Sequence, residues 1–501
     1  MAYTNQTLIA RSKSVFVKEE TTTGTLAYPS ASDYIILTDY PSLEQQQVTT
    51  QVSSVRSSRS RDEVIFDHFS YGTFSGMTIS SRPSGTAGTS PTTGEKTLLK
   101  SALGSVTDSS TTGVSAVSAS AITQANPGVI TVSSHSFQAG DKITIANCTQ
   151  TDYNGDHVVA SVTSTTITTE TDMSAFGTGA ASDGDVTLNM VRFELAEELP
   201  YFSIWILTET GASTSGGAVL EAASGCQISS FSTEVSKNGE LKYTFGGDFY
   251  RQYYGGTAEL SATAANAGTT LTFDSASYDV DNLFFVGQYV NIIDPAESAT
   301  LDSAVEVTAV NSTANTLTVA ALSVTNGPLP VGSIVKPYLP TGTISGDVLA
   351  QRTAQVYLGT ADTDYGHASG DLIESTYSLA AKMGTVSLSQ TLSKPHEKEL
   401  TGDEYPTASF IPGAREISGD VAVVFKLDNQ KYYEDLKNTP RRALAYTVGS
   451  TEGSIVEFYF PKVFMRVPAN SIEEEARTQT FSWETVEPSL GTEREFMLVY
   501  R

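Results

Sequence analysis

Two segments of the chain contain the same series of short alternating runs, and this repeat restricts the fold more than any other feature. A glycine, Gly140 or Gly287, stands before the second run of each series, where a turn needs a residue that tolerates positive φ. Because apolar and polar residues alternate with a period of two, the repeat predicts two small β-barrel-like modules, at 113–190 and 258–340. A chance likeness between two sequences rich in Thr and Val is the alternative explanation. The runs lie at 129–132, 142–145, 158–162 and 166–168, and again at 270–273, 289–292, 305–310 and 316–319.

The rest of the chain, at 1–112, 191–257 and 341–501, holds most of the aromatic and charged residues and has longer alternating runs. The runs at 421–427 and 455–460 are the clearest, and Pro461 is expected to end the second. Val and Thr are abundant throughout, and β-branched side chains pack well on pleated sheets. We therefore expect a mostly β protein, in which these three pieces form one discontinuous β-sandwich or barrel core that carries the two inserted modules.

Low-complexity stretches at 105–125 and 261–270, and proline-rich stretches at 328–330 and 337–340, are interpreted as joints between core and modules. One short helix is expected at 94–103, with Leu98, Leu99, Ala102 and Leu103 on one face and Gly104 as its C-cap. A second helix is expected at 429–437, behind Asp428 as N-cap.

The composition excludes several classes of protein. The formal net charge of −26 repels phosphate backbones, so high-affinity binding of nucleic acid is not expected, although simple solubility also accounts for the charge. The only two cysteines, Cys148 and Cys226, fall in different domains, which argues against a disulfide framework or a cysteine-based metal site. No run approaches the roughly 18 apolar residues of a membrane span, and the N-terminus lacks a secretion signal, so a protein made in a cytoplasm, neither secreted by this route nor embedded in a membrane, is expected.

A search for catalytic, cofactor or metal sites finds none. The five histidines, at 68, 135, 157, 367 and 396, are scattered without metal-ligand spacing. The segment 88–97 approaches a phosphate-binding loop but has five residues between its glycines and Glu95 in place of lysine. Residues 362–366 lack the ligands of a calcium loop, and 152–156 is interpreted as a turn. We expect no enzymatic activity and no cofactor.

Two charged clusters allow two interpretations each. Arg56–Glu63 is the densest basic cluster in this acidic chain, and it could pair with an acidic surface of another copy or form an exposed loop. Glu473, Glu474 and Glu475 with Arg477 could face DNA or a neighbouring subunit, or be simply solvated.

Four stretches of the core resemble one known family. The most characteristic is a strand at 72–76, a turn at 82–91 that reads RPSGTAGTSP, and the helix that ends at Gly104. The others lie at 16–30, at 201–206 with 239–248, and at 418–427 with the final strands up to Tyr500. Together these stretches resemble the tail tube proteins of long-tailed phages (siphophages), and the likeness covers about two thirds of the chain.

The resemblance implies a non-enzymatic virion protein of the phage tail, made in the host cytoplasm. In this family, β-sandwiches join side by side into rings that are usually hexameric. Exposed sheet edges, which would otherwise favour aggregation, then pair in an ordered way between subunits. Stacked rings enclose a channel through which DNA passes during ejection without specific binding, and the partners are other copies and the tape measure, terminator and tail tip proteins. The N-terminal 50 residues fit an arm that orders against a neighbour, and the inserted modules are expected to decorate the outside of the tube.

Other classes of protein remain open from the sequence. A neck, tail-terminator or decoration protein of a virion would be equally β-rich and chemically inert. A β-rich adhesin would be expected to carry exposed aromatics, a carbohydrate site or a trimeric repeat, and an enzyme would need converging chemical groups. Modules displayed on the outside would argue against a contractile sheath by sterics.

Overall fold

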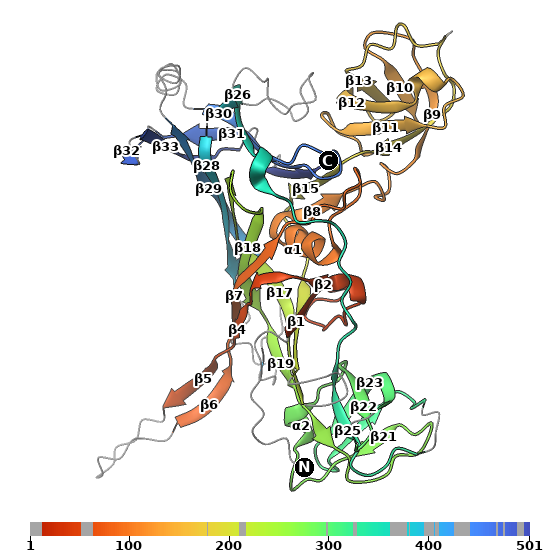
Figure 1. The fold of residues 1–501 in the computed structure, drawn as a ribbon, viewed down its shortest axis with the longest axis vertical. Helices are drawn as coiled ribbons and strands as arrows, with labels where there is room; N and C mark the ends of the chain where they lie inside the picture. The colour runs from red at the N-terminus through yellow and green to blue at the C-terminus, as the bar shows by residue number, and fades with distance from the viewer. Residues whose placement is uncertain are drawn as a thin grey trace.

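The computed structural model describes residues 13–51, 64–177, 179–209, 217–296, 299–323, 328–360, 378–379, 381–394, 405, 410–424, 441–466, 469–473, 476–487 and 495–501. Strands account for 54% of the structure and helices for 6%, so the predicted mostly β fold is confirmed. The molecule is elongated, and the two inserted modules lie at opposite ends of its long axis (Figure 1).

The core is one hydrogen-bonded set of 20 strands, which divides into three parts. The first part has the order β2–β1–β16–β17–β19. Its long strand β17 continues into the second part, which has the order β7–β18–β17–β28–β29–β33, with β3 and β4 on β7 and β32 on β33. The strands are β1 (Lys13–Glu19), β2 (Tyr34–Ile35), β3 (Leu37–Asp39), β4 (Ser42–Glu44), β7 (Gly72–Ser80), β16 (Phe202–Glu209), β17 (Ala218–Ser236), β18 (Lys242–Phe249), β19 (Arg251–Gly255), β28 (Ala381–Ser393), β29 (Ile411–Val424), β32 (Ala469–Glu473) and β33 (Ala476–Thr485).

The third part of the core has the order β27–β26–β30–β31–β34–β15–β8. The sequence had led us to expect that Pro461 ends a strand, but β31 continues through it to Met465. The register between β30 and β31 shifts between Arg442 and Leu444, opposite this proline, and such an irregularity tolerates a residue without an N–H. The strands are β8 (Gly104–Thr107), β15 (Val191–Leu195), β26 (Gln355–Thr360), β27 (Ser378–Leu379), β30 (Arg441–Val448), β31 (Val456–Met465) and β34 (Met497–Tyr500).

Module 1 is the closed barrel of strands β9–β14, and module 2 is the six-stranded sheet of strands β20–β25. When the strands of each module are numbered from one to six along the chain, the same numbers are neighbours in both modules. A bridge between Leu260 and Phe273 joins the two end strands of module 2. Gly140 and Gly287 both have φ of 88°, as their predicted turns require. The strands are β9 (Val117–Ile122), β10 (Val129–Val132), β11 (Lys142–Ala146), β12 (Gly155–Val162), β13 (Thr166–Thr169) and β14 (Asp185–Leu188), and β20 (Ala258–Glu259), β21 (Thr270–Thr272), β22 (Tyr289–Ile293), β23 (Thr300–Asn311), β24 (Thr316–Val319) and β25 (Ile334–Tyr338).

The first and last strand of each module were missed by the sequence analysis. Strand β9 and most of the core strand β8 (Gly104–Thr107) lie within 105–125, and β25 contains Pro337, although both stretches had been interpreted as joints. Small and proline residues are accepted there because the neighbouring strands supply the hydrogen bonds and the packing that define these strands. The connections within these stretches are therefore shorter than expected, at 108–116 between β8 and β9 and after Tyr338 at the end of β25.

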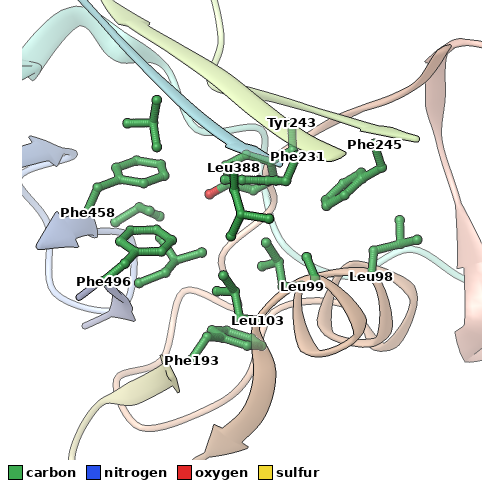
Figure 2. Close-up of a cluster of buried hydrophobic side chains, with 14 of the residues drawn as sticks. Leu98, Leu99, Leu103, Phe193, Phe231, Tyr243, Phe245, Leu388, Phe458 and Phe496 are labelled. Atoms are coloured by element: carbon green, nitrogen blue, oxygen red, sulfur yellow. The ribbon is translucent and has the colours of Figure 1, made fainter. Parts of the chain in front are cut away.

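Helix α1 (Thr93–Leu103) confirms the helix expected at 94–103, and its four predicted apolar residues are fully buried. Gly104 ends the helix with φ of 114°, and a Cβ there would lie 2.6 Å from the Cβ of Ala196. Leu98, Leu99 and Leu103 fill the centre of the core between the rings of Phe193, Phe231, Tyr243, Phe245, Phe458 and Phe496 (Figure 2). The other α-helix of the described chain is α2 (Val280–Leu283), and the helix expected at 429–437 lies outside the described residues.

A separate hairpin projects from the core. Strands β5 (Gln47–Gln51) and β6 (Val64–Phe69) pair only with each other and extend away from the central sheet to the lower left of Figure 1. An isolated two-stranded hairpin is at best marginally stable in water, so contacts beyond its own pairing are needed to hold its shape.

Candidate functional site

Strands β30, β31 and β34 of the core are covered on both faces. Leu444 and Tyr446 of β30 pack into the main core, whereas Ala443 and Ala445 belong to the hydrophobic cluster of module 1. Strands β31 and β34 follow the same alternation, with Tyr459 and Val499 facing module 1. This double burial explains why these strands have continuous apolar sequences, and it leaves no free face for a functional surface.

The first part of the core is also covered on both faces. Phe16 and Trp205 point away from the main core into a second cluster, which is completed by Leu339 and by Phe285 of module 2. The rings of Tyr28 and Tyr289 stack at 3.9 Å between centroids and join the N-terminal segment to module 2. Module 2 therefore covers a core sheet as module 1 does at the other end of the molecule.

One large sheet face is left open by the described residues. In β28, Val386, Leu388 and Leu392 are buried in the core, whereas the alternate residues are exposed hydroxyl side chains. The alternation continues on the neighbouring strands β17 and β29, so the open face extends over β7, β18, β17, β28, β29 and β33. The exposed residues of β28 on this face are Ser387, Ser389, Thr391 and Ser393.

A row of hydroxyl groups crosses this open face in register. Neighbouring strands lie about 4.8 Å apart, so the side chains of a row are in mutual contact distance, as the 3.0 Å hydrogen bond between the hydroxyls of Thr78 and Thr244 illustrates. All members of the row are exposed or half-buried. The row consists of Thr78, Thr244, Ser232, Ser387, Ser418 and finally Glu484, one residue from each of the six strands.

The charge of the open face is acidic. Glu234, Glu416 and Asp420 lie on it together with Glu484, and Asp420 accepts a 2.6 Å hydrogen bond from the hydroxyl of Ser482. Two basic side chains next to the row are neutralised locally. Lys242 pairs with Glu240 at 3.1 Å, and Arg466 pairs with Glu484 at 2.8 Å.

The open face has few of the groups that bind nucleic acids. Phosphate contacts come mainly from Lys, Arg and backbone N–H groups, and single-stranded bases stack on aromatic rings. Among the described residues of the open face, most exposed side chains are hydroxyls and carboxylates; Met383 and Ile411 are apolar exceptions, and Lys242 is paired with Glu240. The aromatic side chains of the same strands point into the core. The open face can therefore remain hydrated beside a polyanion without holding it.

The described residues do not bring the positions considered from the sequence together into a metal site. No group of three or more His, Cys, Asp or Glu in the described chain could hold a metal ion. His157 is buried, its imidazole contacts the hydroxyl of Thr171 and the carbonyl of Tyr153, and burial lowers its pKa, so its role is structural. Both cysteines are buried and free, and residues 362–366, His367 and His396 lie outside the described residues.

Glu95, which departs from the phosphate-loop pattern, has a structural role. Its carboxylate is 2% exposed and accepts hydrogen bonds from the hydroxyls of Ser81 and Tyr500 and from the amide of Arg82. Burial is the largest effect on this carboxyl group and raises its pKa. A carboxylate already enclosed by these donors does not bind phosphate.

The turn expected at 152–156 contains a 3-10 segment at Thr151–Tyr153, which is followed by β12.

The two charged clusters cannot be placed as sites. Arg56–Glu63 lies outside the described residues, as do Glu474 and Glu475. Glu473 is the last residue of β32, and its backbone pairs with Ala476.

The open face was not anticipated from the sequence. Its only sequence signal is serine and threonine at every second position of 385–393 and 230–233, a pattern typical of any half-exposed strand. Comparison with known proteins adds no further site, because neither a family model nor a curated protein matches the chain. No helix of the described residues combines the length and the apolar character that membrane crossing requires.

Proposed function

We propose that the chain is a structural, non-enzymatic subunit of a phage tail tube. In this proposal, copies assemble as stacked rings, usually hexameric in the family that the sequence resembles, around a channel for DNA. The open sheet face lines that channel. The protein then resides in the tail of the virion, and its partners are other copies and the remaining tail proteins.

The observation that carries the proposal is the hydroxyl and carboxylate chemistry of the open face. Among the described residues, modules 1 and 2 cover the outer faces of the other two parts of the core, and no described segment covers this face. A channel that passes DNA without retaining it needs hydration and negative charge rather than lysine, arginine or aromatic groups. A net charge of −26 supports the same role.

Sheet edges support assembly side by side. Among the described residues, β19 pairs only with β17, and β32 pairs only with β33, so each presents an unpaired edge. Unpaired edges are templates for strands of another chain, and ordered pairing between copies satisfies them.

Electron microscopy of the purified protein tests the proposal. We expect tubes of uniform diameter built from stacked rings. A single closed ring that never stacks would favour a neck or tail-terminator protein, and a chain that binds only to preformed particles would favour a decoration protein. A chain that stays monomeric at high concentration and also fails to bind preformed particles would contradict all three, and a β-rich adhesin would then be the better assignment.

Charge placed on the open face tests its position in the tube. In the variant Ser232→Lys, Ser387→Lys, Ser389→Lys, three exposed hydroxyls become cations, and DNA present during assembly should become trapped in the channel and protected from nuclease. The matched control places the same three charges on exposed threonines of module 2, as Thr270→Lys, Thr308→Lys, Thr318→Lys. The control should bind DNA that remains accessible to nuclease. Protection in the control alone would show that the open face does not line the channel.

A further inference from the structure

The loop between β17 and β18 exposes an asparagine that is followed by a glycine. Lys237, Asn238 and Gly239 are all exposed, and Gly239 has φ of 79°. Among the described residues, neither the Asn238 carboxamide nor the Gly239 N–H has a hydrogen-bond partner. Asn238 also lines an open hollow of about 570 Å³. Water therefore reaches its side chain directly.

An asparagine before a glycine can lose its amide nitrogen without an enzyme. The backbone nitrogen of the glycine attacks Cγ of the asparagine, so that an N–Cγ bond forms and the Cγ–Nδ2 bond breaks. The proton of the attacking nitrogen leaves with the amide as ammonia. Water then opens the cyclic imide at one of its two carbonyls and gives aspartate or isoaspartate. Glycine favours the attack because it has no Cβ to hinder the approach.

The base of this loop is held in place. The carbonyl of Gly239 accepts a 3.1 Å hydrogen bond from the backbone amide of Gln351. The buried side chain of Gln351 donates to the carbonyls of Glu234 and Glu240, at 3.0 Å and 2.9 Å. A reaction at Asn238 is therefore confined to the tip of the loop and leaves the pairing of β17 with β18 intact.

A second Asn-Gly pair, in module 1, has the opposite environment. The Asn154 Oδ1 accepts a 2.9 Å hydrogen bond from the amide of Cys148, and its Nδ2 donates a 3.1 Å bond to the carbonyl of Cys148. Gly155 begins β12 and pairs with Ile145. Attack on Asn154 requires this segment to open first. The remaining Asn-Gly pair of the chain, at 326–327, lies outside the described residues.

We propose that Asn238 is a site of spontaneous deamidation in the folded protein, whereas the fold protects Asn154. Water is the co-reactant and ammonia the leaving group. The product adds one carboxylate to each copy, in the hollow that Glu234 and Glu240 already line at the end of the open face. This inference does not rest on the proposed function, because the reaction needs neither a partner nor assembly.

A time course on the wild-type protein tests the site. The folded protein is incubated at pH 9, digested, and mapped by mass spectrometry for the conversion of each asparagine. Asn238 should convert at least about tenfold faster than Asn154, because two hydrogen bonds must break before Asn154 reacts. The matched control is the same chain in denaturant, where both asparagines precede a glycine without structure and should convert at similar rates.

Two results of the time course would overturn the proposal. One is equal conversion of Asn154 and Asn238 in the folded protein. The other is an Asn238 that stays intact in the folded protein while it reacts in denaturant, since the loop would then protect it.

The products at position 238 test the chemistry separately. Isoaspartate arises only through the cyclic imide, whereas direct hydrolysis of the amide gives aspartate alone. We expect both products, detected by enzymatic methylation of isoaspartate, and a rate that rises from pH 7 to pH 9 because the Gly239 nitrogen must lose its proton. Aspartate alone would show that Gly239 does not attack and would overturn the assignment.

Discussion

Arg192 of β15 forms an ion pair with Asp141 of module 1, and each side chain is only 2% exposed. The same guanidinium donates to Glu194 at 3.1 Å and to the carbonyl of Ser136 at 3.1 Å. This network fastens the turn before β11 to the core strand that follows module 1. Module 1 is therefore joined to the core by buried charge as well as by the shared hydrophobic cluster.

Removal of the arginine should destabilise the protein strongly. Arg192→Met leaves the Asp141 carboxylate buried without its cation, and we expect a loss of about 3–5 kcal/mol in the free energy of unfolding, measured by chemical denaturation. The double variant Arg192→Met, Asp141→Asn removes both charges and should recover part of that loss. A loss below about 1 kcal/mol for the single variant would mean that the pair does not hold module 1 to the core.

Gln288 occupies the position in module 2 that Asp141 occupies in module 1, directly after the turn glycine. It is fully buried, and neither amide atom has a hydrogen-bond partner among the described residues. Gln288→Met should therefore raise the free energy of unfolding by about 1 kcal/mol. The control is Gln351→Met, because the Gln351 amide is satisfied by Ser236, Glu234 and Glu240, and this variant should destabilise by about 1–3 kcal/mol. Equal changes in the free energy of unfolding for the two variants would contradict the conclusion that the Gln288 amide lacks hydrogen bonds and the Gln351 amide has them.

Glu95 should make stability depend on pH. Burial raises its folded-state pKa above the unfolded value, so its contribution favours the folded state at acidic pH and is lost as pH rises through the folded pKa. Glu95→Gln cannot ionise and should be more stable than wild type at pH 8. Thermal unfolding of both proteins from pH 5 to pH 8 should show that the advantage of the variant grows with pH. A difference that is constant with pH would contradict the assignment.

Gly419 of β29 is required by close packing rather than by its backbone angles. A Cβ there would lie 1.9 Å from the carbonyl oxygen of Thr385 and 2.6 Å from the Trp483 ring. Gly419→Ala should cost about 1–3 kcal/mol, because neither the strand nor the buried ring can move without loss of packing. Gly413→Ala on the same strand is the control, since its Cβ would approach no closer than 3.2 Å, and it should have little effect in the same denaturation measurement.

Local features of the fold could be predicted from the sequence because they depend on neighbouring residues. Helix α1, its apolar face and its C-cap at Gly104 follow from periodicity and from one glycine. The turns at Gly140 and Gly287, and the strands around them, follow from alternation in the same way. The strands β9 and β25 were missed because their own residues carry a weak signal, and they are strands through their pairing with neighbours, β9 with β10 and β14, and β25 with β20 and β22.

The candidate site depended on the tertiary structure. The alternation at 385–393, which the sequence analysis had not singled out, is by itself sufficient for a strand with one mainly apolar and one hydroxyl face, since alternation requires no distant contact. Only the tertiary structure decided that this hydroxyl face stays open while module 1 covers β30 and β31, and that Arg192 meets Asp141 across 51 positions of sequence. The physical reason is that burial is a property of the layers that pack together, whereas alternation is a property of one strand alone.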